Sequence, residues 1–161
     1  MLALAGIDLD ELTTALQDQG GYDEHRWLID PATGEIAFWT PELGLDGRGD
    51  AADEEELDER GLFPIEPIPS RVWYRDMADF AARLTDDGAR RRLARALDGR
   101  GPFRLFGNAV HRERADVLTA WNALRNTRAQ RHAVDWLADN NLIPEAEATA
   151  FRAAHPDPPV P

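Results

Sequence analysis

Apolar residues at helical spacing predict a short helix near the start of the chain, over residues 8–18. Acidic residues gather at its beginning, where the helix dipole favours negative charge. Gly20 and Gly21 follow, and glycines of this kind commonly end a helix. The apolar positions of the stripe are Leu9, Leu12 and Leu16.

The next pattern predicts a β-hairpin over residues 25–39. Two apolar runs, 25–29 and 36–39, flank a connection that contains Pro31 and Gly34, both typical turn residues. A two-stranded hairpin is marginally stable alone, so we expect it to pack on another element. Residues 62–69 are also apolar, but three prolines remove backbone donors, which predicts an edge strand or an extended segment.

The second half of the chain is predicted to be mostly helical. Ser70 suits the N-cap of a first helix, and Thr85 or Asp86 can begin a second. Residues 114–139 form one long helix or two, and a last short helix covers 144–154. The first two apolar stripes comprise Trp73, Met77, Phe80, Ala81 and Leu84, then Ala89, Leu93, Ala96 and Leu97. The fold class is therefore α+β, with a small antiparallel sheet near the N-terminus packed on a mostly helical C-terminal half.

The length of 161 residues predicts a single α+β domain over residues 1–154. Residues 41–60 hold nine acids and little apolar surface, so we expect an acidic mobile loop, with a short helix over 51–60 as the alternative. Residues 155–161 contain four prolines, and we expect them to be a disordered tail.

Charge is distributed unevenly along the chain, whose net charge is −12. Residues 1–69 carry 18 acids and 3 arginines, whereas residues 70–161 carry 12 acids and 15 arginines. The acidic total argues against general nucleic-acid binding, but the basic second half leaves a local anion site open. All basic residues are arginine, so the chain holds no lysine for a Schiff base or a Walker-type phosphate loop.

The sequence excludes several classes of chemistry. It has no cysteine, which rules out disulfides and thiolate metal sites. Its four histidines lack metal-ligand spacing, and its single serine, Ser70, has no nucleophile motif around it, so we expect no metal, no cofactor and no catalytic residue. No apolar stretch is long enough for a membrane helix and residues 1–7 do not form an export signal, so we expect a cytoplasmic protein that does not associate with a membrane.

A first candidate site is a polar cluster at the junction of the extended segment and the following helix. The functional interpretation is a site whose carboxylates take a proton and whose arginines hold an anion. The alternative, which we favour, is a set of salt bridges that fixes the junction. Its members are Glu66, Arg71, Tyr74, Arg75, Asp76 and Asp79.

A second candidate is an arginine and aromatic surface that could stack bases and hold phosphates. Solvated helix faces and internal pairing with the acidic first half are the alternatives, and we favour them because the net charge opposes nucleic acid. Its members are Arg100, Phe103, Arg104, Phe106, Trp121, Arg125 and Arg128.

Three stretches carry a resemblance to a known family: residues 65–71, residues 74–80 with Tyr74, Arg75, Asp76 and Met77, and residues 96–106. Together with the early helix, the hairpin and the long helix, they resemble the bacterial family designated uncharacterised protein family 0158. The likeness covers most of residues 7–143, whereas the acidic 41–60 segment and the proline-rich tail depart from the family pattern. The resemblance implies a bacterial cytoplasmic protein and supplies no catalytic residue.

These observations favour a non-catalytic interaction or regulatory protein with a protein partner. One alternative is a nucleic-acid-associated protein that uses the arginine and aromatic surface. A further alternative is a small hydrolase or transferase that uses Glu66, Asp76 or Asp79 as acid or base. The sequence assigns no oligomeric state.

Overall fold

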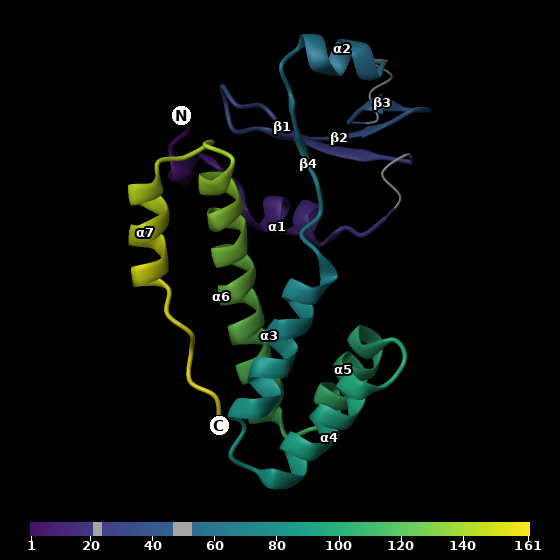
Figure 1. Ribbon diagram of the computed structural model, residues 1–161, viewed down its shortest axis with the longest axis vertical. Coiled ribbons are helices and arrows are strands. Elements are labelled where there is room, and N and C mark those ends of the chain that lie inside the picture. The colour runs from purple at the N-terminus through teal and green to yellow at the C-terminus, as the bar shows by residue number, and fades with distance from the viewer. Residues whose placement is uncertain (21–23, 47–52) are drawn as a thin grey trace. The chain divides into compact units, whose positions relative to one another are not determined.

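The structure, a computed structural model, describes residues 1–20, 24–46 and 53–161. The chain divides into two compact units (Figure 1). Unit 1 comprises Met1–Ile68 and Gln130–Ala154, and unit 2 comprises Pro69–Ala129 and His155–Pro161. Within the described residues there are seven α-helices and one four-stranded antiparallel sheet near the N-terminus, which confirms the α+β class. The prediction of a single domain over residues 1–154, made from chain length, stays a prediction.

The sheet of unit 1 contains β1 (Arg26–Ile29), β2 (Ile36–Thr40), β3 (Gly44–Leu45) and β4 (Phe63–Ile65) in the order β3-β2-β1-β4. Each neighbouring pair is antiparallel, and Leu28 of β1 lies opposite Ala37 and Pro64. The predicted hairpin is therefore present, and Gly34 turns it with a φ of 80°. Strand β4 contains Pro64 and lies at the edge of the sheet. The outer side of an edge strand has no neighbouring strand, so a proline without an N–H group leaves no hydrogen bond between strands unmade there.

Unit 1 also contains helices. A 3-10 turn, Leu4–Gly6, precedes α1 (Leu9–Gln17), whose N-cap Asp8 accepts hydrogen bonds from the backbone N–H groups of Asp10 and Glu11. The Ile68 N–H donates to the Leu16 carbonyl at 2.9 Å, which joins α1 to the chain after β4. Helix α7 (Glu145–Ala154) runs beside the C-terminal end of α6 (Ala115–Asp139), where Arg152 pairs with Asp135 (Figure 1).

The acidic segment 41–60 contains regular structure where it is described. Helix α2 (Glu54–Glu59) begins at Asp53, whose carboxylate accepts the Glu56 N–H at 2.9 Å. Leu57 is buried with Leu28 and Trp39, and Glu54 pairs with Arg26 of β1 at 2.9 Å, so apolar and ionic contacts hold α2 on the sheet. The short helix expected as the alternative to a mobile loop is thus seen over these residues. The part of that segment at 47–52 lies outside the described residues.

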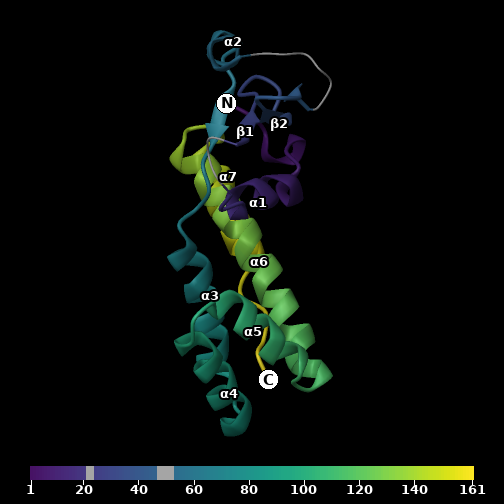
Figure 2. The same ribbon diagram turned by 90° about the vertical axis from the view of Figure 1, so that its right-hand side faces the viewer.

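Unit 2 is built from α3 (Ser70–Arg83), α4 (Asp87–Asp98), α5 (Pro102–His111) and residues 115–129 of α6. Figure 2 shows α4 and α5 beside one another, and Arg92 of α4 forms an ion pair with Glu113, which lies just after the end of α5. The core of unit 2 gathers large apolar side chains from all four helices. Among them are Phe80, Leu93, Phe106, Trp121 and Leu124.

Three details of unit 2 differ from the sequence expectations. Helix α3 begins at Ser70 itself and has no side-chain cap hydrogen bond, because Pro69 precedes it. Helix α5 was not anticipated: Gly101, with a φ of 68°, turns the chain and Pro102 starts the helix. The tail expected to be disordered contacts the helical part of unit 2, since the Thr85 N–H donates to the Pro161 carbonyl at 3.1 Å.

Candidate functional site

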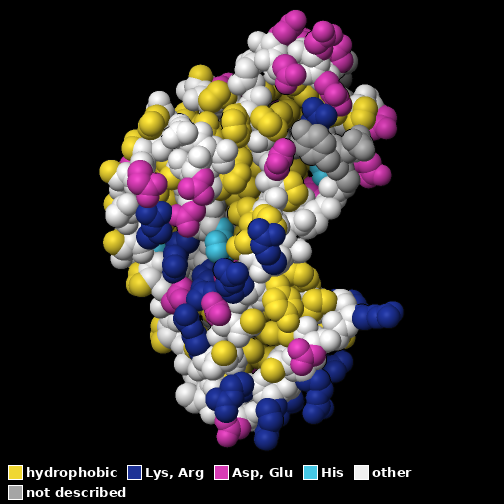
Figure 3. Space-filling view, viewed as in Figure 1, with side chains coloured by type: hydrophobic (Ala, Val, Ile, Leu, Met, Phe, Trp, Pro, Cys, Tyr) yellow, Lys and Arg dark blue, Asp and Glu magenta, His cyan; other side chains and the backbone are white. Residues whose placement is uncertain are grey.

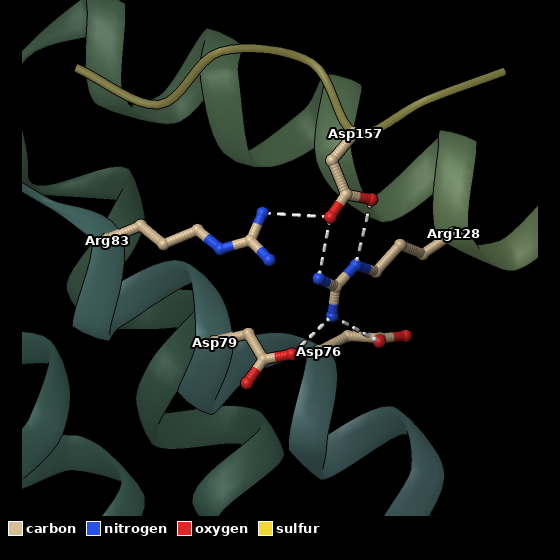
Figure 4. A network of polar contacts seen from close by, with 5 residues as sticks. All are labelled: Asp76, Asp79, Arg83, Arg128 and Asp157. Atoms are coloured by element: carbon tan, nitrogen blue, oxygen red, sulfur yellow. Dashed lines mark hydrogen bonds and ion pairs between the residues drawn. The ribbon is translucent and has the colours of Figure 1, made fainter.

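The centre of the site is Arg128, a guanidinium on α6 whose side chain is only 11% exposed. Its Nη1 donates to Asp76 Oδ1 at 3.1 Å and to Asp79 Oδ2 at 2.6 Å. Its other edge faces Asp157, with Nε 3.2 Å from Oδ1 and Nη2 2.8 Å from Oδ2 (Figure 4). One arginine therefore bonds three carboxylates, and we call these residues together with Arg83 the Arg128 network.

The helical spacing of α3 places two of these carboxylates under Arg128. Asp76 and Asp79 lie three positions apart, so they project from one side of the helix. Their neighbours Met77 and Phe80 turn into the core of unit 2, which fixes the rotation of α3. The Asp76 side chain is 8% exposed and is buried with its partner, whereas Asp79 keeps 42% of its side chain in solvent.

The third carboxylate comes from the C-terminal segment, residues 155–161. Asp157 also accepts a hydrogen bond from Arg83 Nη1 at 2.8 Å, so two guanidinium groups share its Oδ2 atom (Figure 4). Val160 packs against the apolar core of unit 2. The segment expected to be a disordered tail is thus held by ionic, apolar and backbone contacts.

The electrostatics keep Arg128 charged. Its pKa is raised above the ordinary value, chiefly by the hydrogen bonds to Asp157 and then by those to Asp79 and Asp76, although burial acts in the opposite direction. Two guanidinium groups face three carboxylates, so the network carries an excess of one negative charge. The arrangement binds and orients a carboxylate, and the acids serve as acceptors for arginine.

The predicted polar cluster is only partly brought together. Asp76 and Asp79 meet at Arg128, a residue that was placed in the other candidate. The Tyr74 hydroxyl donates to the Leu97 carbonyl at 3.2 Å, and the exposed Arg71 and Arg75 form no ion pair among the described residues. Glu66 belongs to unit 1, whereas the other five residues belong to unit 2.

Two of the three rings of the predicted arginine and aromatic surface lie in the core. Phe106 is 1% exposed and Trp121 is 6% exposed, and their ring centroids lie 4.9 Å apart in an edge-to-face contact. Neither ring has a face free for a nucleobase. Arg128 is buried in its network. The exposed members that remain are Arg100, Phe103, Arg104 and Arg125.

Sequence reasoning missed Arg83 and Asp157 as members of the site. Arg83 was not singled out by any pattern, and Asp157 lay in a segment expected to be disordered. One signal was present: Val160 is an apolar residue within an otherwise proline-rich and polar tail. An apolar anchor of this kind indicates that a segment docks on a core.

Unit 2 also carries a set of exposed arginines. It has 13 arginines against 8 acids, a net charge of +5, whereas unit 1 has 5 arginines against 22 acids, a net charge of −17. Figure 3 shows dark blue side chains at the α4 end of unit 2 and magenta side chains over α2 of unit 1. Among the described residues, eight unit 2 arginines are exposed and form no ion pair: Arg71, Arg75, Arg91, Arg95, Arg100, Arg104, Arg112 and Arg125.

Other arginines of unit 2 are neutralised by nearby acids. Arg92 holds Glu113 with two hydrogen bonds, of 2.6 and 2.9 Å, and this contact lowers the pKa of Glu113 although burial opposes it. Arg90 pairs with Asp87 and Arg114 with Asp116. A groove of about 400 Å³ is lined by Arg92, Ala109, Arg112 and Glu113.

Two further findings concern metal ions and membrane-spanning helices. Over residues 1–20, 24–46 and 53–161, no group of three or more histidine or acidic side chains is placed to hold a metal ion. Within the same ranges, no helix has both the length and the apolar character that crossing a bilayer requires.

The fold and the Arg128 network define a small α+β protein in which an arginine on a long helix ties two helices and the C-terminal segment together. The chain is 33% identical over 140 residues to the UPF0158 protein PA5073 of Pseudomonas aeruginosa, an alignment that covers 87% of this chain and 86% of that protein. The chain therefore belongs to the UPF0158 family, and the resemblance seen in its sequence is confirmed. No protein-family profile matches the chain, and no solved structure matches it.

Proposed function

We propose that the protein is a non-catalytic interaction or regulatory protein whose unit 2 binds an acidic protein partner. The observation that carries this proposal is the set of eight exposed arginines without ion pairs on a unit of net charge +5. A guanidinium binds carboxylates through paired, planar hydrogen bonds, so a surface of unpaired arginines suits a partner rich in aspartate and glutamate.

Helix α4 presents this surface most clearly. Its buried residues are Ala89, Leu93 and Leu97, which lie on one side of the helix. Arg91 and Arg95 are four positions apart on the opposite side, and both are exposed. Because the core of unit 2 fixes the buried side, the two guanidinium groups point to solvent together and can bind neighbouring carboxylates.

The experiment compares two double variants of the full chain for binding to poly-L-glutamate. R91Q/R95Q removes two exposed, unpaired arginines of unit 2. R60Q/R114Q is the matched control, because it removes the same charge from two exposed arginines already paired with Glu56 and Asp116. The proposal predicts a dissociation constant at least tenfold higher for R91Q/R95Q, with a much smaller change in the control. Equal losses in the two variants would reject the proposal.

One observation favours a second candidate, a nucleic-acid-associated protein. Phe103 is 44% exposed at the start of α5, between the exposed Arg100 and Arg104. An exposed ring flanked by arginines suits a stacked base with phosphates on either side. This second candidate predicts that the chain binds single-stranded poly-U more tightly than poly-L-glutamate. It also predicts that F103A weakens the binding of poly-U and leaves the binding of poly-L-glutamate unchanged. A chain that binds only poly-L-glutamate supports the acidic protein partner.

A further inference from the structure

The Arg128 network contains a carboxylate-binding site that is already assembled. Asp76 and Asp79 both accept from Nη1, so they hold one corner of the guanidinium and orient the rest. The Nε and Nη2 atoms remain as a pair of parallel donors, which is the geometry by which arginine recognises a carboxylate. Asp157 uses this pair, and Arg83 adds a third donor to its Oδ2 atom.

The occupant of this site resembles a bound peptide. Residues 155–161 read His-Pro-Asp-Pro-Pro-Val-Pro and contain no helix or strand. Prolines on both sides of Asp157 restrict the backbone to extended conformations, so little conformational entropy is lost when it binds. Three anchors hold the segment: the Asp157 carboxylate, the Val160 side chain on the core, and the Pro161 carbonyl that accepts the Thr85 N–H.

The site does not depend on this occupant for its charge balance. Without Asp157, Asp76 and Asp79 of α3 still bond the Arg128 guanidinium. Arg83 is 44% exposed, so water can solvate it when the carboxylate leaves. The C-terminal segment can therefore be released without leaving Arg128 as an isolated buried charge.

We propose that Arg83 and Arg128 form a recognition site for an acidic, proline-flanked peptide, and that the C-terminal segment occupies this site as an intramolecular ligand. A tethered ligand acts at a millimolar effective concentration, so it excludes a free peptide of ordinary affinity. A partner segment of the same chemistry binds once the C-terminal segment is displaced. This site uses Arg83 and Arg128, which are both paired with carboxylates, so it is distinct from the unpaired, exposed arginines of α4.

The test uses the full chain and a fluorescent, acetylated peptide with the sequence of residues 155–161. D157N weakens the intramolecular ligand, and D98N is the matched control, because Asp98 is an exposed unit 2 acid outside the network. We expect the peptide to bind D157N at least tenfold more tightly than it binds wild type or D98N. A peptide with asparagine at its third position should not bind D157N more tightly than wild type. The protein variant R83Q/D157N should likewise show no increase in affinity for the original peptide.

Backbone amide exchange gives a second measurement that does not need peptide binding to be strong. The Thr85 N–H bonds Pro161, so in D157N it should exchange at least tenfold faster than in D98N. Added peptide with aspartate should restore its protection. Unchanged Thr85 exchange in D157N, or equal affinity of the wild type and D157N for the peptide, would overturn the proposal.

Discussion

Arg128 on α6 and Asp76 on α3 are 52 positions apart in the sequence, and their Nη1 and Oδ1 atoms lie 3.1 Å apart in the structure. Both side chains are nearly buried, with 11% and 8% of their surface exposed. A buried pair of this kind contributes little net stability compared with apolar residues, but the loss of one partner strands the other charge. The pair joins α3 to α6 at these two positions.

Removing Arg128 should destabilise the protein more than removing the whole pair. We expect R128M to lower the free energy of unfolding by about 3 to 5 kcal/mol, because Asp76, Asp79 and Asp157 then lose the guanidinium that they share. D76L/R128M should recover part of this loss, since no buried charge is left. Urea denaturation followed by circular dichroism measures both values. A double variant less stable than R128M would contradict this account of the pair.

Two phenylalanines on α5 should respond very differently to truncation. Phe106 is 1% exposed and contacts Trp121, whereas Phe103 is 44% exposed. We expect F106A to cost about 3 to 5 kcal/mol of unfolding free energy through the cavity it leaves. F103A should change stability by only about 0.5 kcal/mol. Thermal or urea unfolding of the two variants provides the comparison, and similar losses would show that Phe106 is not a core residue.

The contrast between these two rings shows what local pattern could and could not predict. Short-range spacing of apolar residues and the turn residues between them predicted the positions of four elements: strands β1 and β2 and helices α3 and α4. Helix α5 was missed because Gly101 and Pro102 look like a loop until the stripe formed by Phe106 and Val110 is recognised. Without that helix, Phe106 could not be separated from Phe103.

The candidate site was predicted less well because it depends on contacts that are distant in the sequence. Asp76 and Asp79 were singled out as members of the polar cluster, and Arg128 as a member of the arginine and aromatic surface, but no local pattern links the two groups. Asp157 joins them from a segment whose proline content is typical of disorder. This segment is ordered by tertiary contacts alone, and the periodicity of a sequence does not predict such contacts.

The pH dependence of stability should report on Asp18 in unit 1. Its pKa is lowered, first by the hydrogen bond from the Trp27 Nε1–H at 2.8 Å and further by the Gly20 N–H and His25, while burial opposes the shift. A carboxyl group with a lowered pKa in the folded state contributes stability above its ordinary pKa. That contribution is lost as the pH falls through the lowered value.

The variant D18A should therefore be less stable than wild type by about 2 kcal/mol at neutral pH, because Trp27 and His25 lose a charged acceptor. The difference should shrink steadily below about pH 4, as the wild-type carboxylate takes up a proton. Urea titrations at a series of pH values follow this difference. A constant difference down to the most acidic condition would contradict the role given to the Asp18 charge.

The most direct test of the proposed function is the ionic-strength dependence of poly-L-glutamate binding by the full chain. Exposed arginines such as Arg91 and Arg95 act through charges that salt screens. The dissociation constant of the wild type should rise at least tenfold between about 50 and about 200 mM salt, and the rise should be smaller for R91Q/R95Q. Binding that is insensitive to salt, or a salt dependence identical in the two proteins, would contradict a partner site built from these arginines.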